Sequence, residues 1–145
     1  MIEKLMVKVQ DASSGDYPQE VVRYAEAGPI GDFIALVSGL TAGILCFTNF
    51  FGGWVGYHTP YGLLMLLTSA AIAAFSAAML AARFAFNRVP TFRSPTWAYY
   101  LGGSAIVILS MTALVFGWKG AALSPVLFFT FMNGVVMFIA GMVSN

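Results

Sequence analysis

The length of the uncharged stretches limits most strongly what this chain can fold into. No Asp, Glu, Lys or Arg occurs between Asp32 and Arg83, and none occurs after Lys119. Each stretch is longer than the roughly 20 apolar residues that one helix needs to cross a bilayer. With 59% hydrophobic and 9% charged residues and a mean hydropathy of +0.82, a chain of 145 residues would expose too much apolar surface to water. The sequence therefore predicts an integral membrane protein.

The apolar sequence divides into four candidate spans. Segments rich in Gly, Pro and aromatic residues separate four runs with approximate bounds at residues 33–51, 62–85, 97–118 and 125–143. Each run is continuously apolar, whereas strands of a membrane barrel alternate in polarity and have only about ten residues. We therefore expect an all-α membrane protein. Four transmembrane helices in two helical hairpins would form a bundle over residues 32–145, after a polar, acidic segment at residues 1–31 that includes a short amphipathic stretch.

The basic residues predict the orientation of the bundle. Arg88 and Arg93 lie between the second and third spans, and Arg83 lies in the last turn before them, whereas the third connection carries only Lys119 and the first has none. By the positive-inside rule the middle connection faces the cytoplasm. Four spans then place both termini on the cytoplasmic side of a bacterial inner membrane, or on the equivalent side of an organellar membrane.

Aromatic residues mark the two membrane surfaces. Tyrosine and tryptophan settle at the level of the lipid headgroups, and the expected anchors are Trp54, Tyr57, Tyr61, Trp97 and Trp118. The first and third connections share the pattern Gly-Trp-x-Gly followed by Ser/Thr-Pro. Duplication of a hairpin and the common physics of interfacial turns both explain this pattern.

His58 is the single histidine and lies in the first connection. As a functional residue it would bind haem iron, a chlorophyll magnesium or a metal ion, or accept a proton at the membrane surface. We favour a polar side chain in an interfacial turn, because no second histidine exists and no acidic residue lies nearby in the sequence. We expect no cofactor or metal site of the chain's own, and we expect bound structural lipids.

The acidic residues argue against two functional classes. All six lie within the first 32 residues, so we expect a membrane region without carboxylates. Proton-coupled carriers generally need an ionisable residue inside the membrane. The sequence also shows no carboxylate pair, metal-ligand cluster or nucleophile beside a base. We therefore expect no catalytic residues and no enzyme activity.

Small residues predict how the helices pack. They recur at every fourth position in the second span and form a GxxxG pattern in the first: Ser69, Ala73, Ala77 and Ala81, with Gly39 and Gly43. Such columns let helix backbones approach closely, so we expect the second span at the centre. Asn133 needs a hydrogen-bonding partner in the membrane, and we expect one on another helix.

The N-terminal segment carries three basic and six acidic residues when Asp32 is included. The spacing of Ile2, Leu5, Met6 and Val9 is typical of an amphipathic helix, although the sequence also permits a short strand there. A second helix is expected over residues 18–27. We expect this segment to fold against the basic middle connection or against the basic surface of a partner.

These observations favour a non-catalytic accessory subunit of a larger membrane protein complex, respiratory or photosynthetic for instance. Its partners would be other membrane subunits and lipids, with no nucleic acid. The sequence is also compatible with two other functions. One is a small oligomeric channel or carrier for a neutral or anionic solute, and the other is a lipid- or pigment-binding membrane module.

Overall fold

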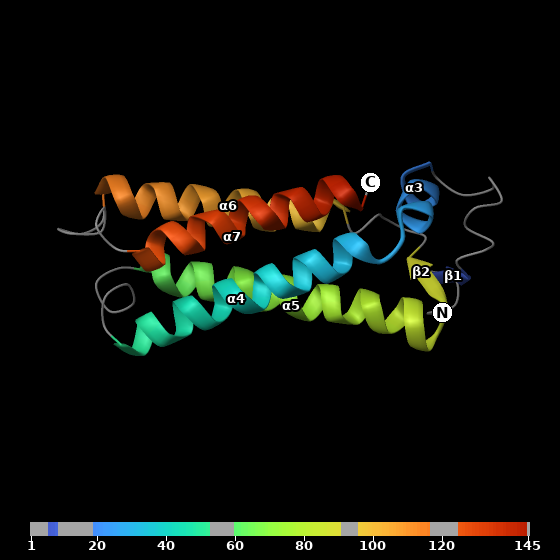
Figure 1. Ribbon diagram of the computed structural model, residues 1–145, viewed down its shortest axis with the longest axis horizontal. Coiled ribbons are helices and arrows are strands. Elements are labelled where there is room, and N and C mark those ends of the chain that lie inside the picture. Colours follow the sequence, from blue (N-terminus) through green and yellow to red (C-terminus); the bar gives the residue numbers. More distant parts are fainter. Residues whose placement is uncertain (1–5, 9–18, 53–59, 91–95, 117–124, 145) are drawn as a thin grey trace.

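The protein is mostly helical (Figure 1). Its structure, a computed structural model, describes residues 6–8, 19–52, 60–90, 96–116 and 125–144. Within these residues the elements follow one another in the order β1 (Met6–Lys8), α3 (Gln19–Ala27), α4 (Ile30–Gly52), α5 (Pro60–Ala85), β2 (Arg88–Pro90), α6 (Thr96–Phe116) and α7 (Pro125–Val143).

The described part of each predicted span lies on one of the four long helices, which confirms the helical class. Two helices among the described residues are long and apolar enough to cross a membrane, over Ile30–Phe47 with a mean hydropathy of 1.9 and over Leu63–Ala85 with a mean hydropathy of 2.1. A shorter apolar helix covers Phe128–Val143. The structure thus supports two membrane-crossing helices, and the four-span topology stays a prediction.

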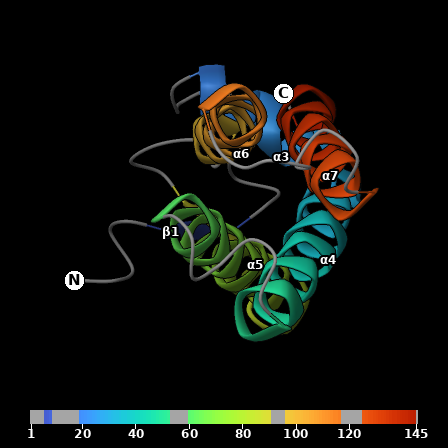
Figure 2. The same ribbon diagram turned by 90° about the vertical axis from the view of Figure 1, so that its left-hand side faces the viewer.

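The four long helices lie side by side in a curved row (Figure 2). α6 packs along α7, α7 along α4 and α4 along α5, whereas the contact between α5 and α6 is smaller. The row is therefore more open between α5 and α6. The expectation that the second span lies at the centre is wrong, because α4 and α7 occupy the middle and α5 lies at one end of the row.

Glycines allow close backbone contacts at two of the helix interfaces, between α4 and α5 and between α6 and α7. A Cβ atom on Gly39 of α4 would lie 3.1 Å from the backbone oxygen of Ser69 and 3.1 Å from the backbone nitrogen of Ala73, both on α5. A Cβ on Gly103 of α6 would lie 2.6 Å from the backbone nitrogen of Phe138 on α7. Small residues at such points let the backbones of two helices approach each other closely.

The N-terminal segment folds against the middle connection. β1 and β2 form an antiparallel pair in which Met6 is opposite Pro90, and Lys8 is opposite Arg88. A short strand therefore occurs at residues 6–8, the alternative to the amphipathic helix expected there. α3 begins one residue after the predicted start and ends at the predicted Ala27, before Gly28, whose φ of 81° suits a glycine that stops a helix.

A small hydrophobic cluster joins these elements. Val21, Tyr24 and Ala25 of α3 are buried against Val89 of β2, and Val7 of β1 packs on the same cluster. Figure 1 shows α3 and the sheet at one end of the long helices, where α7 also ends. We call this end, with α3 and the β1–β2 sheet, the tail end.

Candidate functional site

Four polar side chains from four different helices meet at the tail end. They are Tyr24 of α3, Asp32 of α4, Arg83 of α5 and Tyr99 of α6, and all four are buried. Asp32 and Tyr99 are 0% exposed, which is unusual for a carboxylate unless it is paired. We call these residues the Asp32 network.

The helix ends explain why the two charges lie there. α4 begins at Ile30, directly after Pro29, and this places Asp32 in its first turn. Arg83 lies in the last turn of α5. A helix dipole favours an acid near its N-terminus and a base near its C-terminus. Both charges are therefore stabilised by their own helices before they meet each other.

The carboxylate of Asp32 accepts hydrogen bonds on both oxygens. The hydroxyl of Tyr24 donates to Oδ2 over 2.6 Å, and Nε of Arg83 donates to the same oxygen over 3.1 Å. The hydroxyl of Tyr99 donates to Oδ1. The carboxylate thus links α4 to α3, α5 and α6.

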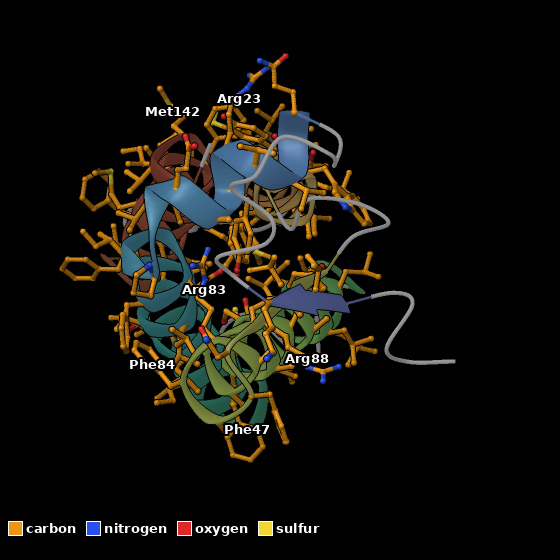
Figure 3. All side chains as sticks on the ribbon, turned by 90° about the vertical axis from the view of Figure 1, so that its right-hand side faces the viewer. Arg23, Phe47, Arg83, Phe84, Arg88 and Met142 are labelled. Carbon is orange, nitrogen blue, oxygen red and sulfur yellow. The ribbon has the colours of Figure 1, made fainter. Side chains whose placement is uncertain are left out.

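The guanidinium of Arg83 is held by Tyr24 as well. Its Nη2 atom donates to the backbone oxygen of Tyr24 over 2.7 Å, and its Cζ atom lies 4.2 Å from the centre of the Tyr24 ring. A cation over an aromatic face gains further electrostatic attraction. Figure 3 shows Arg83 pointing inward, whereas Arg23 and Arg88 lie at the periphery of the tail end.

Electrostatics favours one protonation state of Tyr24. Burial raises the pKa of its hydroxyl, and the nearby charge of Asp32 raises it further. The phenol therefore remains protonated and donates to the carboxylate. Both tyrosine hydroxyls, and the Nε and Nη2 atoms of Arg83, donate to other members of the network, which suits a structural role in joining helices.

The second feature is an apolar groove between α5 and α6 with a volume of about 400 Å³. We call it the α5–α6 groove, and its lining residues are Thr68, Ala71, Ile72, Phe75, Trp97, Ala98, Leu101, Gly102 and Ala105. The groove lies where the row of helices is more open (Figure 2). Its walls suit an acyl chain or another apolar group.

Several residues predicted from the sequence fall outside the described residues or side chains. They are Trp54, Tyr57, His58, Tyr61, Arg93 and Trp118. The favoured interpretation of His58 as a polar side chain in an interfacial turn therefore stays a prediction, as does its alternative role as a ligand. Within the part of the chain that the structure describes, no group of three or more His, Cys, Asp or Glu residues could hold a metal ion.

The predicted packing residues separate into two groups. Gly39, Gly43, Ser69 and Ala73 lie where α4 and α5 meet. Ala77 and Ala81 are exposed on α5 and contribute to no contact that buries them.

Asn133 forms a hydrogen bond within its own helix. Its Nδ2 atom donates to the backbone oxygen of Phe129, one turn earlier in the same helix, over 2.8 Å. The structure thus gives one N–H of the amide a partner in its own helix, and the expected interhelical hydrogen bond stays a prediction. Trp97 is 38% exposed and lines the α5–α6 groove.

The Asp32 network was not predicted from the sequence. Asp32 was grouped with the polar N-terminal segment, and a membrane region without carboxylates was expected, but Asp32 lies inside α4 and is buried between helices. A detectable signal was present: a lone acid at the start of one apolar run and a lone Arg83 at the end of the next. In an antiparallel hairpin these two positions lie at the same end.

No family model matches the chain, and neither a curated protein nor a solved structure matches it.

Proposed function

We propose that this chain is a non-catalytic accessory subunit of a larger membrane protein complex, with α4, α5, α6 and α7 all crossing the bilayer. Two of these helices are long and apolar enough by themselves. α6 and α7 pack beside them along the row, and their exposed side chains include Leu101, Ile108 and Phe128. Such a surface suits lipid or other apolar helices better than water.

The observation that carries the proposal is an exposed alanine face on α5. Its members recur three or four residues apart and are all exposed: Ala70, Ala74, Ala77 and Ala81. In a membrane, an alanine has no advantage over a leucine in contacts with lipid. Small residues do, however, let a second helix approach closely. An unpartnered alanine face on an edge helix therefore supports a partner subunit there.

A neighbouring groove extends this surface. A groove of about 260 Å³ runs between α4 and α5, and Gly39, Gly43 and Ala70 are among its lining residues. Ala70 belongs to both the groove and the alanine face, so the two adjoin. A partner helix with large side chains would fill this groove.

The test is site-specific photocrosslinking in the native membrane. A photoreactive amino acid at Ala74 should give a discrete crosslink to one membrane protein, identified by mass spectrometry. The same residue at Val115 of α6, which is 67% exposed and far from the alanine face in the sequence, is the matched control. Crosslinks to lipid alone at Ala74 would contradict the proposal.

A matched pair of substitutions adds a functional readout. Ala74→Leu should block close approach of the partner and reduce its co-purification in mild detergent, whereas Val115→Leu should leave it unchanged. Equal co-purification with both variants would contradict a partner on the alanine face.

The proposed orientation places β1 and the end of α7 on the cytoplasmic side. Figure 1 shows both at the tail end, where β2 also lies. This placement follows from the positive-inside rule. Cysteine labelling at positions 93 and 119, in a chain with Cys46→Ala, tests it: exposure of position 93 on the outer side would overturn the orientation.

The channel or carrier alternative gains no support from the described residues. Six of the hydroxyl and amide side chains on the long helices donate to carbonyls of their own helices: Ser38, Thr68, Ser69, Ser76, Thr112 and Asn133. A path for a polar solute needs such groups turned toward the solute.

A further inference from the structure

The two short strands place two cations next to each other. Lys8 of β1 and Arg88 of β2 are direct partners in the antiparallel register. Residues opposite one another project from the same face of a sheet, and their neighbours in sequence project from the other face. Val7 and Val89 pack on the α3 cluster, so Lys8 and Arg88 lie on the outer face.

This pair of cations lacks a counter-charge among the described residues. Lys8 is exposed and Arg88 is half-buried, and neither forms an ion pair with a residue that the structure describes. Like charges directly opposite each other destabilise a strand pair. By contrast, Arg83 is neutralised by Asp32. An anion bound between Lys8 and Arg88 would convert their repulsion into two favourable contacts.

The position of the pair relative to α5 indicates which anion is available. Arg88 follows Ala85, the last residue of α5, by only three positions. α5 is one of the two helices long and apolar enough to cross a membrane, and Phe86 beside its end is 69% exposed. Lys8 and Arg88 therefore lie where the chain leaves the bilayer, at the level of the lipid phosphates.

The α5–α6 groove lies at the right depth for an acyl chain. Phe75 lines the groove and lies ten positions before Ala85, the last residue of α5. Ten helical residues rise about 15 Å, and one leaflet of the hydrocarbon core is also about 15 Å thick. A chain that enters the bilayer beside the end of α5 therefore reaches Phe75 and the groove.

We infer that Lys8 and Arg88 bind the phosphate of an anionic phospholipid and that one of its acyl chains lies in the α5–α6 groove. The inference rests on the membrane placement proposed above and is independent of the partner subunit. Anionic lipids are concentrated in the cytoplasmic leaflet, which is the side that the positive-inside rule assigns to the tail end.

The test uses full-length protein in a non-ionic detergent, titrated with dioleoylphosphatidylglycerol and with dioleoylphosphatidylcholine, which has the same chains and no net charge. Native mass spectrometry measures the bound lipid. Lys8→Gln or Arg88→Gln should each lower the affinity for phosphatidylglycerol about fivefold, and the double variant about 30-fold. Arg23→Gln is the matched control, because Arg23 is an exposed cation on α3 that lies apart from Arg88 (Figure 3).

A second pair of variants tests the groove. Ala71 is exposed and lines the α5–α6 groove, whereas Ala74 is exposed on the alanine face. Ala71→Phe should weaken binding of dioleoylphosphatidylglycerol at least fivefold and leave binding of the short-chain dihexanoyl lipid unchanged. Ala74→Phe should affect neither lipid. Equal effects of the two variants would overturn the assignment of the chain to the groove.

Four results would overturn the headgroup site. Loss of affinity in Arg23→Gln equal to that in Arg88→Gln would show unspecific attraction, and equal binding of both dioleoyl lipids would exclude charge recognition. Displacement of the lipid by millimolar inorganic phosphate would assign the cations to a free anion. Unchanged lipid binding in the double variant, together with loss of a co-purifying protein, would assign them to an acidic partner.

The membrane placement is tested separately by extraction of native membranes with alkaline carbonate. Release of the protein by carbonate would contradict the proposed function itself. Retention in the membrane together with equal binding of both dioleoyl lipids would overturn the lipid site alone.

Discussion

The Oδ2 atom of Asp32 and the Nε atom of Arg83 lie 3.1 Å apart, although 51 positions separate the two residues in the sequence. Asp32 lies in the first turn of α4, and Arg83 lies in the last turn of α5. The connection between these helices joins their other ends. The ion pair therefore fixes the register of the hairpin at the end that the connection leaves free.

Removing one charge of this pair should destabilise the protein more than removing both. Asp32→Asn leaves the guanidinium of Arg83 buried without a counter-charge, which costs about 3 to 5 kcal/mol in known buried pairs. The double variant Asp32→Asn with Arg83→Met keeps an acceptor for the tyrosines and removes the unpaired cation. We expect it to recover more than half of the lost free energy of unfolding, measured by denaturant unfolding in detergent.

Arg23→Gln is the control for this series, because Arg23 is exposed on α3. A loss below about 1 kcal/mol is expected there, as for other exposed charges. The argument fails if Asp32→Asn behaves like Arg23→Gln.

The raised pKa of Tyr24 predicts a loss of stability at alkaline pH. Burial and the charge of Asp32 keep the folded hydroxyl protonated above its ordinary pKa of 10.0. Above about pH 10 the unfolded chain releases this proton and the folded chain retains it, so the free energy of unfolding falls by up to about 1.4 kcal/mol per pH unit. This contribution is fully present below pH 10 and is lost as the pH rises.

Tyr24→Phe isolates that contribution. The variant should lose about 1.5 to 3 kcal/mol at neutral pH, because a hydrogen bond to a charged group is removed. Its free energy of unfolding should then fall less steeply than that of the wild type from about pH 10 to about pH 11. Val21→Ala, in the same α3 cluster, removes no ionisable group, so it is the control and should keep the wild-type slope. Parallel curves for Tyr24→Phe and the wild type would contradict the role of Tyr24.

The two helix interfaces predict opposite outcomes for similar glycine substitutions. A Cβ at Gly103 would lie 2.7 Å from the backbone oxygen of Gly134, so Gly103→Ala forces α6 and α7 apart. A Cβ at Gly43 would meet no atom nearer than 3.7 Å. Gly43→Ala should therefore be neutral or stabilise α4 by up to about 1 kcal/mol through helix propensity. Thermal unfolding in detergent should show a midpoint below that of the wild type for Gly103→Ala. For Gly43→Ala the midpoint should equal or exceed that of the wild type. The same shift for both variants would be inconsistent with this packing.

The sequence predicted the helices better than their contacts. The long apolar runs predicted the positions of α4 to α7, because a continuous apolar run longer than a strand favours a helix. The same alanine column on α5 was compatible with a central or an edge position, because small residues permit close packing without choosing a partner. The structure leaves Ala77 and Ala81 exposed and buries Ser69 and Ala73.

The Asp32 network could not be read from local patterns for a different reason. Asp32 borders a polar segment and an apolar run, so its composition alone fits either side. Tyr24 and Tyr99 join it from sites 8 and 67 residues away. Only the antiparallel placement of the helices brings these groups together, and only burial shows that the acid must be paired.

Docking of the N-terminal segment depends on Val89, which is fully buried against α3. Val89→Asn places an amide in an apolar cluster without a partner, which costs about 1 to 3 kcal/mol. This exceeds what a two-stranded pair of three residues supplies by itself, so β1 and α3 should separate from β2. Limited proteolysis in detergent should then cut the N-terminal segment at least about fivefold faster, in proportion to the increased open population. Val22→Asn, at a half-buried position of α3, is the control and should change the cleavage rate much less. Equal cleavage of Val89→Asn and the wild type would mean that the segment is held by contacts other than the Val89 cluster.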